Sequence, residues 1–181
     1  MLRIISGLYR SRKISQPDLK DTRPTTDKVR EAVFASLQFK IENKSFLDLF
    51  SGSGAIAIEA LSRGALKVYA VEKNIKVFRV LQENLQSLKI DTINAVASDA
   101  LNFLQVNTMK FDFIYLDAPY LDYKLLNDTL QLISQAKTLN IDGEIIIETN
   151  KVSEVVIPDD FIVYKSKRYG KVDILYLAYA Q

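Results

Sequence analysis

Beyond residue 44, short runs of consecutive apolar residues alternate with segments in which apolar residues recur every three or four positions. The runs predict buried strands, and the recurring pattern predicts helices that pack on them. Strands are predicted at 45–50, 67–73, 92–98, 111–117 and 144–149, and helices at 51–64 behind a glycine loop, after residue 73, at 101–104 and at 123–139, with a turn at Asp142-Gly143. Repeated strand–helix units predict an α/β fold with a mostly parallel, doubly wound sheet.

The C-terminal part of the chain predicts a different kind of pairing. Segments 161–168 and 172–179 are rich in β-branched and aromatic residues, and Tyr169-Gly170 stands between them. This pattern predicts a hairpin that closes the sheet with antiparallel strands. Its basic residues either extend a basic surface or are simply solvated; they are Lys165, Lys167, Arg168 and Lys171.

The N-terminal segment predicts a small separate unit. Residues 2–14 predict two short strands that turn near Gly7, with Arg10 and Arg12 on one face of a strand. Pro24 then interrupts regular secondary structure, and a helix with an apolar stripe is predicted after it. We therefore divide the chain into an N-terminal β-hairpin extension with its following segment at 1–25 and a main domain at 26–181.

Positive charge is concentrated at this end of the chain. Residues 1–30 hold eight Lys/Arg and three Asp, a balance of +5, whereas the whole chain carries only +2. A basic extension on a mildly acidic body suggests a polyanionic partner reached through the N-terminus. A solvated surface segment explains the charge equally well.

Composition excludes several kinds of chemistry. The chain has 181 residues, 48% of them hydrophobic, which suits one globular domain with a real core. No apolar run approaches the ~18 residues of a membrane span or resembles a signal peptide, so the cytoplasm is the expected compartment. With no cysteine and no histidine, disulfides, thiolate nucleophiles, Cys/His zinc sites and imidazole catalysis are excluded, and no metal site is predicted.

An acidic residue stands at the carboxyl end of each of the first four predicted parallel strands: Asp48, Glu72, Asp99 and Asp117. Because ligands bind at this edge of such sheets, four acids in register predict one site. Glu72 lies 24 residues after Asp48, where an acid can bind both hydroxyls of a ribose. Asp99 offers a carboxylate to an adenine amino group and Ala100 a small contact for its ring. An adenosine-containing cofactor is therefore expected.

NAD and S-adenosylmethionine both contain adenosine. Gly52-x-Gly54-x-x-Ala57 matches the loose dinucleotide motif, which is compatible with NAD. Asp48, however, places a carboxylate just before the glycine loop, where it would repel a pyrophosphate and attract a sulfonium or ammonium group. The pattern therefore favours S-adenosylmethionine over NAD.

The stretch Asp117-Ala118-Pro119-Tyr120 is typical of methyltransferases that act on amino groups. The Asp117 side chain and the Ala118 carbonyl can each accept one N–H of an exocyclic amine, which directs the nitrogen lone pair toward the methyl group. Pro119 stiffens the loop, and Tyr120 offers a flat face on which a base can stack. Transfer then depends on alignment and electrostatics, so no histidine is needed.

Several longer segments resemble the RsmD-type 16S ribosomal RNA guanine-N2 methyltransferases. They are RIISGLYRSRKI, RPTTDKVREAVFASL, DLFSGSGAIAIEALSRGA, AVEK, SDA and DAPY, and together they span nearly the whole chain. The resemblance implies a Rossmann-like methyltransferase fold and an N-terminal RNA-binding hairpin. It also implies, as substrate, a guanine of small-subunit RNA, the guanine-966 equivalent, within a ribosomal assembly particle. We expect a monomer. Ala118 departs from the family, which usually has proline there.

The resemblance also implies roles for individual residues. The cofactor group is Asp48, Phe50, Ser51, Gly52, Gly54, Glu72, Asp99 and Ala100, and the catalytic group is Asp117, Ala118, Pro119 and Tyr120. Candidates for RNA phosphates are Arg3, Arg10, Arg12, Lys13 and Arg23, although Arg23 and Thr25 are alternatively expected to brace the active site.

Other functions remain open at this point. The same loop serves N6-adenine methyltransferases of DNA or RNA and glutamine methyltransferases of release factors. A protein substrate would not need the basic extension. An RNA-binding assembly factor that lost activity through Ala118 is a further alternative, and an NAD-dependent dehydrogenase the weakest.

Overall fold

A computed structural model describes residues 1–18 and 25–181 of the chain. Seven strands form one sheet in the order β5-β4-β3-β6-β7-β9-β8. The strands β3 to β7 pair in parallel, and β9 pairs antiparallel with both β7 and β8. Their bounds are Ser45–Asp48 (β3), Lys67–Glu72 (β4), Ile93–Ala97 (β5), Phe111–Leu116 (β6), Leu139–Thr149 (β7), Phe161–Tyr169 (β8) and Val172–Tyr179 (β9). The predicted parallel sheet with a closing antiparallel hairpin is confirmed.

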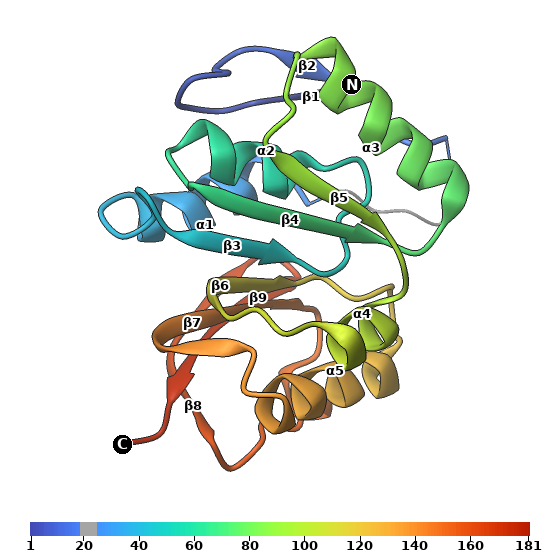
Figure 1. The fold of residues 1–181 in the computed structure, drawn as a ribbon. Helices are drawn as coiled ribbons and strands as arrows, with labels where there is room; N and C mark the ends of the chain where they lie inside the picture. The colour runs from blue at the N-terminus through green and yellow to red at the C-terminus, as the bar shows by residue number, and fades with distance from the viewer. Residues whose placement is uncertain (19–24) are drawn as a thin grey trace.

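Helices cover both faces of this sheet (Figure 1). The helices are Asp27–Leu37 (α1), Ala55–Ser62 (α2), Ile75–Ser87 (α3), Ala100–Val106 (α4) and Tyr123–Gln135 (α5), with a 3-10 turn at Val152–Glu154. One hydrophobic cluster joins α1, α2 and α3 to the sheet, and a second joins α4 and α5 to its other face. Strand side chains alternate between the two clusters, as Phe46 and Leu47 do on β3. The doubly wound prediction therefore holds for both faces.

The strand β7 begins earlier than the apolar pattern predicted. The helix predicted at 123–139 ends at Gln135, and β7 continues through Asp142 and Gly143, so the predicted turn is wrong. The register with β6 shifts between Phe111 and Phe113, which marks a bulge at this point. A side chain at Gly143 would lie 2.8 Å from the Asp112 carbonyl oxygen, so glycine permits the close approach of the strands rather than a turn.

The N-terminal hairpin is shorter in its strands and wider in its turn than predicted. Its strands are Leu2–Arg3 (β1) and Lys13–Ile14 (β2), so Arg10 and Arg12 lie in the connection and not along a strand. The connection forms backbone hydrogen bonds within itself, such as that from Arg10 N–H to the Gly7 carbonyl oxygen at 3.1 Å, and it also bonds to α2. Leu8 N–H donates to the Ser62 carbonyl oxygen at 2.8 Å.

A buried glutamate anchors the same connection. The fully buried Glu59 on α2 accepts from the backbone N–H groups of Ile5 (2.9 Å) and Ser6 (3.0 Å). It also accepts from Arg63 Nε at 2.9 Å and faces Arg30 Nε at 3.8 Å. A buried carboxylate is stable only with such partners. Glu59 therefore holds the hairpin on the first helical layer.

Candidate active site

The acidic residues at the strand ends meet at one edge of the sheet, as predicted. Asp48 ends β3, Glu72 ends β4, and Asp117 follows β6. Because β3 lies between β4 and β6, the chain reverses its strand order at β3, the place where open α/β sheets bind ligands. A cavity of about 740 Å³ opens at this edge.

Ten of the twelve predicted cofactor and catalytic residues line this cavity. They are Phe50, Ser51, Gly52, Glu72, Asp99, Ala100, Asp117, Ala118, Pro119 and Tyr120. The other two, Asp48 and Gly54, are buried next to residues that line the cavity. One site therefore contains both predicted groups.

In the half of the cavity formed by the glycine loop, Glu72 accepts hydrogen bonds from the backbone. Its carboxylate accepts from Gly52 N–H at 2.9 Å and from Asn74 N–H at 2.7 Å. Asp99 caps α4 by accepting from Asn102 N–H at 2.7 Å, and Ala100 follows it as a buried small residue. These contacts fix both carboxylates beside the glycine loop, within reach of a ligand that lies along it.

Asp48 is a buried carboxyl group that forms no ion pair with any of the described residues. Its side chain is 1% exposed, and Phe50 N–H donates to Oδ1 over a long 3.4 Å. Burial, and to a smaller extent the charge of Glu72, raise the pKa of Asp48 to about 7. A positive charge bound nearby would lower the pKa of Asp48 again and stabilise its anionic form.

The other half of the cavity holds a second pair of carboxyl groups. The Thr25 hydroxyl lies 2.8 Å from Glu148 Oε2 and 3.3 Å from Asp117 Oδ2, and Tyr115 donates to Glu148 at 2.7 Å. Burial, and then the charges of Glu148 and Asp48, raise the pKa of Asp117 well above its ordinary value. Asp117 is therefore stabilised in its neutral form. The expected bracing by Thr25 is confirmed as a contact.

Glu148 and Tyr115 were not among the predicted site residues. Glu148 stands near the carboxyl end of β7, so the rule that selected the other acids applies to it as well. Tyr115 lies inside the apolar run of β6 and is completely buried, and nothing in its sequence context distinguishes it from a core residue.

The loop after β6 leaves the sheet as a tight turn. Asp122 N–H donates to the Pro119 carbonyl oxygen at 3.0 Å, and Asp122 then caps α5 by accepting from Leu125 N–H at 3.0 Å. Tyr120 is 69% exposed at the mouth of the cavity. Its ring is therefore accessible to a planar ligand.

The predicted phosphate contacts lie outside the cavity. Arg3, Arg10, Arg12 and Lys13 are exposed on the N-terminal hairpin, whereas Leu2, Gln16 and Pro17 of the same segment line the cavity. Arg23 lies outside the described residues.

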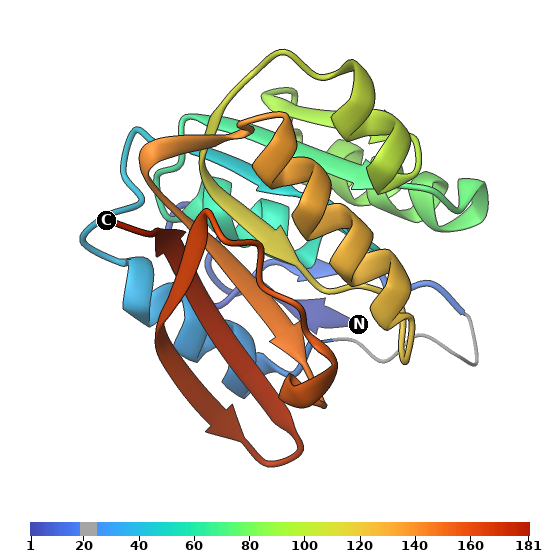
Figure 2. The same cartoon turned by 90° about the horizontal axis from the view of Figure 1, so that it is seen from below.

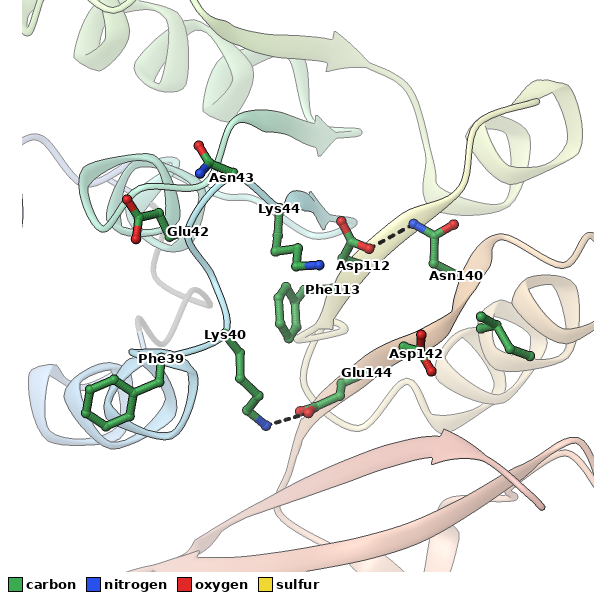
Figure 3. A pocket seen from close by; sticks show the side chains of 11 residues that line it. Phe39, Lys40, Glu42, Asn43, Lys44, Asp112, Phe113, Asn140, Asp142 and Glu144 are labelled. Carbon is green, nitrogen blue, oxygen red and sulfur yellow. Dashed lines mark hydrogen bonds and ion pairs between the residues drawn. The ribbon is translucent and has the colours of Figure 1, made fainter.

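A second hollow of about 660 Å³ lies at the opposite, amino-terminal edge of the sheet (Figure 3). Lys40 forms an ion pair with Glu144 there at 2.5 Å, and the Asn140 amide donates to Asp112 at 2.9 Å. No residue of the predicted site lies there.

The fold and the cavity define the class of protein. A parallel sheet with an antiparallel end, a glycine loop, strand-end acids and an Asp-Ala-Pro-Tyr loop in one cavity are the features of a Rossmann-like methyltransferase. Within the described parts of the chain, none of the helices has the length and apolar character needed to cross a bilayer.

Comparison with known proteins identifies the family. Residues 2–178 match the family model described as Conserved hypothetical protein 95. Ribosomal RNA small subunit methyltransferase D of Escherichia coli K12 is 34% identical over 172 residues, covering 94% of this chain and 86% of the relative. The Haemophilus influenzae protein of the same name is 35% identical over 175 residues, covering 94% and 90%. The solved Escherichia coli structure "Putative methyltransferase yhhF" superposes with a TM-score of 0.88 at 33% identity, covering 99% of both chains. The chain belongs to this family of RsmD-type methyltransferases.

Proposed function

We propose that the protein transfers a methyl group from S-adenosylmethionine to the exocyclic N2 amine of a guanine in 16S ribosomal RNA, the guanine-966 equivalent. The observation that carries the proposal is the meeting of the Asp117 loop and the glycine loop in one cavity, in a chain of this family. The relatives are named as ribosomal RNA small subunit methyltransferases, which supports ribosomal RNA as the substrate.

The residues of the glycine-loop half fit the proposed cofactor. Glu72 and Asp99 offer carboxylates to ribose hydroxyls and to an adenine amine, and Ala100 leaves room beside the ring. Asp48, a buried carboxyl whose pKa is raised to about 7, is stabilised as an anion by a nearby sulfonium or ammonium group. The bound cofactor supplies a methyl group activated by the positive sulfur.

The residues of the other half orient the acceptor. Asp117 and the Ala118 carbonyl each accept one N–H of the amine, which aligns its lone pair for displacement. A neutral Asp117 still has a carbonyl oxygen that accepts, so its raised pKa is compatible with this role. The exposed Tyr120 ring stacks on the base.

The N-terminal hairpin is proposed to bind the RNA. Arg3, Arg10, Arg12 and Lys13 are exposed and offer their charges to phosphates, while the adjoining residues line the cavity. In this proposal residues 1–25 form the RNA-binding segment and 26–181 the methyltransferase domain, although the hairpin packs firmly on α2. The enzyme acts as a cytoplasmic monomer on an assembling small subunit.

The proposal is tested on the RNA itself. Mass spectrometry of 16S RNA from cells that lack the protein should show one guanine without its N2-methyl group, and expression of the wild-type chain should restore it. Loss of a methyl-adenine instead would overturn the guanine assignment. Unchanged methylation with altered subunit assembly would favour the assembly factor.

The role of Asp117 is tested by two substitutions. If Asp117 accepts a hydrogen bond, Asp117→Asn keeps an oxygen of nearly the same reach and should retain measurable single-turnover transfer. Asp117→Ala loses the acceptor and should be slower by about 10²–10³. Equal loss in both variants, with cofactor affinity intact by calorimetry, would contradict the acceptor role and indicate a general base.

A further inference from the structure

The tip of the β8–β9 hairpin, residues 165–171, comprises the end of β8 and the connection to β9; it is called the β8–β9 turn below and carries the densest positive charge of the chain's C-terminal half. The seven residues 165–171 read KSKRYGK, with four basic residues and no acidic one. The proposed function assigns them no role. Their place in the fold argues against a merely solvated segment.

The sheet topology brings this turn to the edge where the active site lies. Because β9 is antiparallel to both β7 and β8, β8 runs in the same direction as β7. The turn therefore lies at the carboxyl end of β7, and Asp173 pairs with Thr149, the residue next to Glu148. Figure 2 shows the turn of the red hairpin beyond the arrowhead of the orange strand β7. Lys171 and Val172 line the active-site cavity itself.

The basic side chains of the turn differ in how they are held. Arg168 donates to Asp173 at 3.2 Å, and Lys165 Nζ lies 4.7 Å from the centre of the Tyr176 ring. Lys167 and Lys171 are exposed, and across residues 1–18 and 25–181 neither forms an ion pair. These two ammonium groups are therefore available to an outside anion.

A nucleotide in the cavity supplies such anions. A base that reaches Asp117 remains attached to its sugar and to two flanking phosphates. These phosphates must therefore lie at the opening of the cavity. Lys171 lines the cavity and is exposed, and Gln16 and Pro17 of the N-terminal segment line the same cavity. A lysine on a flexible stem suits a phosphate, which it binds as a point charge.

We propose that the β8–β9 turn is a second RNA-binding surface, in which Lys167 and Lys171 bind phosphates close to the target nucleotide. The inference rests on the proposed function and extends it. The N-terminal hairpin and the turn then contact the same RNA from two segments far apart in the sequence, both of which contribute to the lining of the cavity.

The test compares two double variants of equal charge change. Lys167→Ala/Lys171→Ala removes the proposed contacts, and Lys44→Ala/Lys110→Ala removes two exposed lysines from the amino-terminal edge of the sheet, where Figure 3 shows Lys44. Binding to a small-subunit RNA fragment is measured at several salt concentrations, with melting temperature and S-adenosylmethionine affinity as checks on folding.

The first variant should lower the log–log salt slope by about 0.7–0.9 for each lost contact, or about 1.4–1.8 in all. The KM for RNA should rise, and cofactor affinity should not change. Salt slopes that are equal in the two variants would overturn the inference. So would a defect seen only on assembled particles, since the turn would then contact protein. Failure of the wild-type chain to methylate any small-subunit RNA would instead refute the proposed function.

Discussion

Asp48 is 1% exposed at the end of β3, and burial raises the pKa of its carboxyl from 3.8 to about 7. A group whose pKa is raised on folding stabilises the protein in its protonated form. Its contribution is complete below about pH 4, falls as the pH rises, and is lost above about pH 7. The difference of roughly three pKa units corresponds to at most ~4 kcal/mol, at 1.36 kcal/mol for each unit.

Asp48→Asn should remove this loss of stability at high pH, because the asparagine amide cannot ionise. We expect the variant to unfold in urea with a free energy about 1–3 kcal/mol above that of the wild type at pH 8, and with a smaller difference at pH 5. The expected gain is below the limit because the amide does not reproduce every hydrogen bond of the carboxyl group. The charge of Asp48 also raises the pKa of Asp117, so Asp48→Asn relieves that repulsion too, and the measured gain includes this contribution. The exposed Asp142→Asn serves as a control and should show no such change.

Bound cofactor should act in the opposite direction and favour the wild type over Asp48→Asn. A cation beside Asp48 lowers its pKa, so S-adenosylmethionine should stabilise the wild type more than Asp48→Asn, and its affinity for the wild type should increase as the pH rises through about 7. Parallel stability profiles of the two proteins between pH 5 and 8, in the absence of cofactor, would refute the reasoning.

Three further changes test other parts of the structure. Glu72→Ala should weaken S-adenosylmethionine binding in calorimetry, and NAD should bind neither protein; NAD binding without S-adenosylmethionine binding would disprove the cofactor assignment. Gly7→Ala should lower the free energy of unfolding by about 1–3 kcal/mol, because its Cβ would lie 1.8 Å from a carbonyl oxygen of α2. Gly170→Ala, also at positive φ but with no atom within 4 Å, should cost less, and equal losses would contradict the steric explanation. Arg10→Ala/Arg12→Ala should lower the log–log salt slope of RNA binding by the amount expected for about two phosphate contacts. An unchanged slope would indicate that these arginines are solvated and do not contact RNA.

The sheet and much of the site were predictable because both follow from repeated local patterns. Strand and helix periods identify the βα units, and parallel strands bring the residues at their carboxyl ends together. Asp48, Glu72 and Asp117 could therefore be assigned to one cavity from sequence alone. Glu148 follows the same rule, but it lies within the apolar run 144–149, whose pattern predicts only a buried strand.

Other features depend on contacts that no local pattern encodes. The bulge near Gly143 reflects the close packing of β7 on β6, and an Asp-Gly pair inside a strand has the composition of a turn. The wide connection of the N-terminal hairpin exists because Glu59, more than fifty residues away, accepts its backbone N–H groups. Tyr115 has the sequence neighbours of a core residue, and its role becomes visible only in the structure, where its hydroxyl donates to Glu148.

A buried asparagine also ties the N-terminal segment to the cofactor half of the site. Asn84 on α3 is 2% exposed, and its side chain bonds both backbone groups of Ser15 and the carbonyl oxygen of Ser53 in the glycine loop. Leaving such a buried polar group unpaired costs about 1–3 kcal/mol, so the segment and the loop resist separation. Glu59 adds a second buried attachment on α2. The surface proposed to bind RNA and the loop proposed to bind the cofactor are therefore held in a fixed relation. A transfer that depends on aligning an amine with a methyl group requires such a relation, because small misplacements cost large factors in rate.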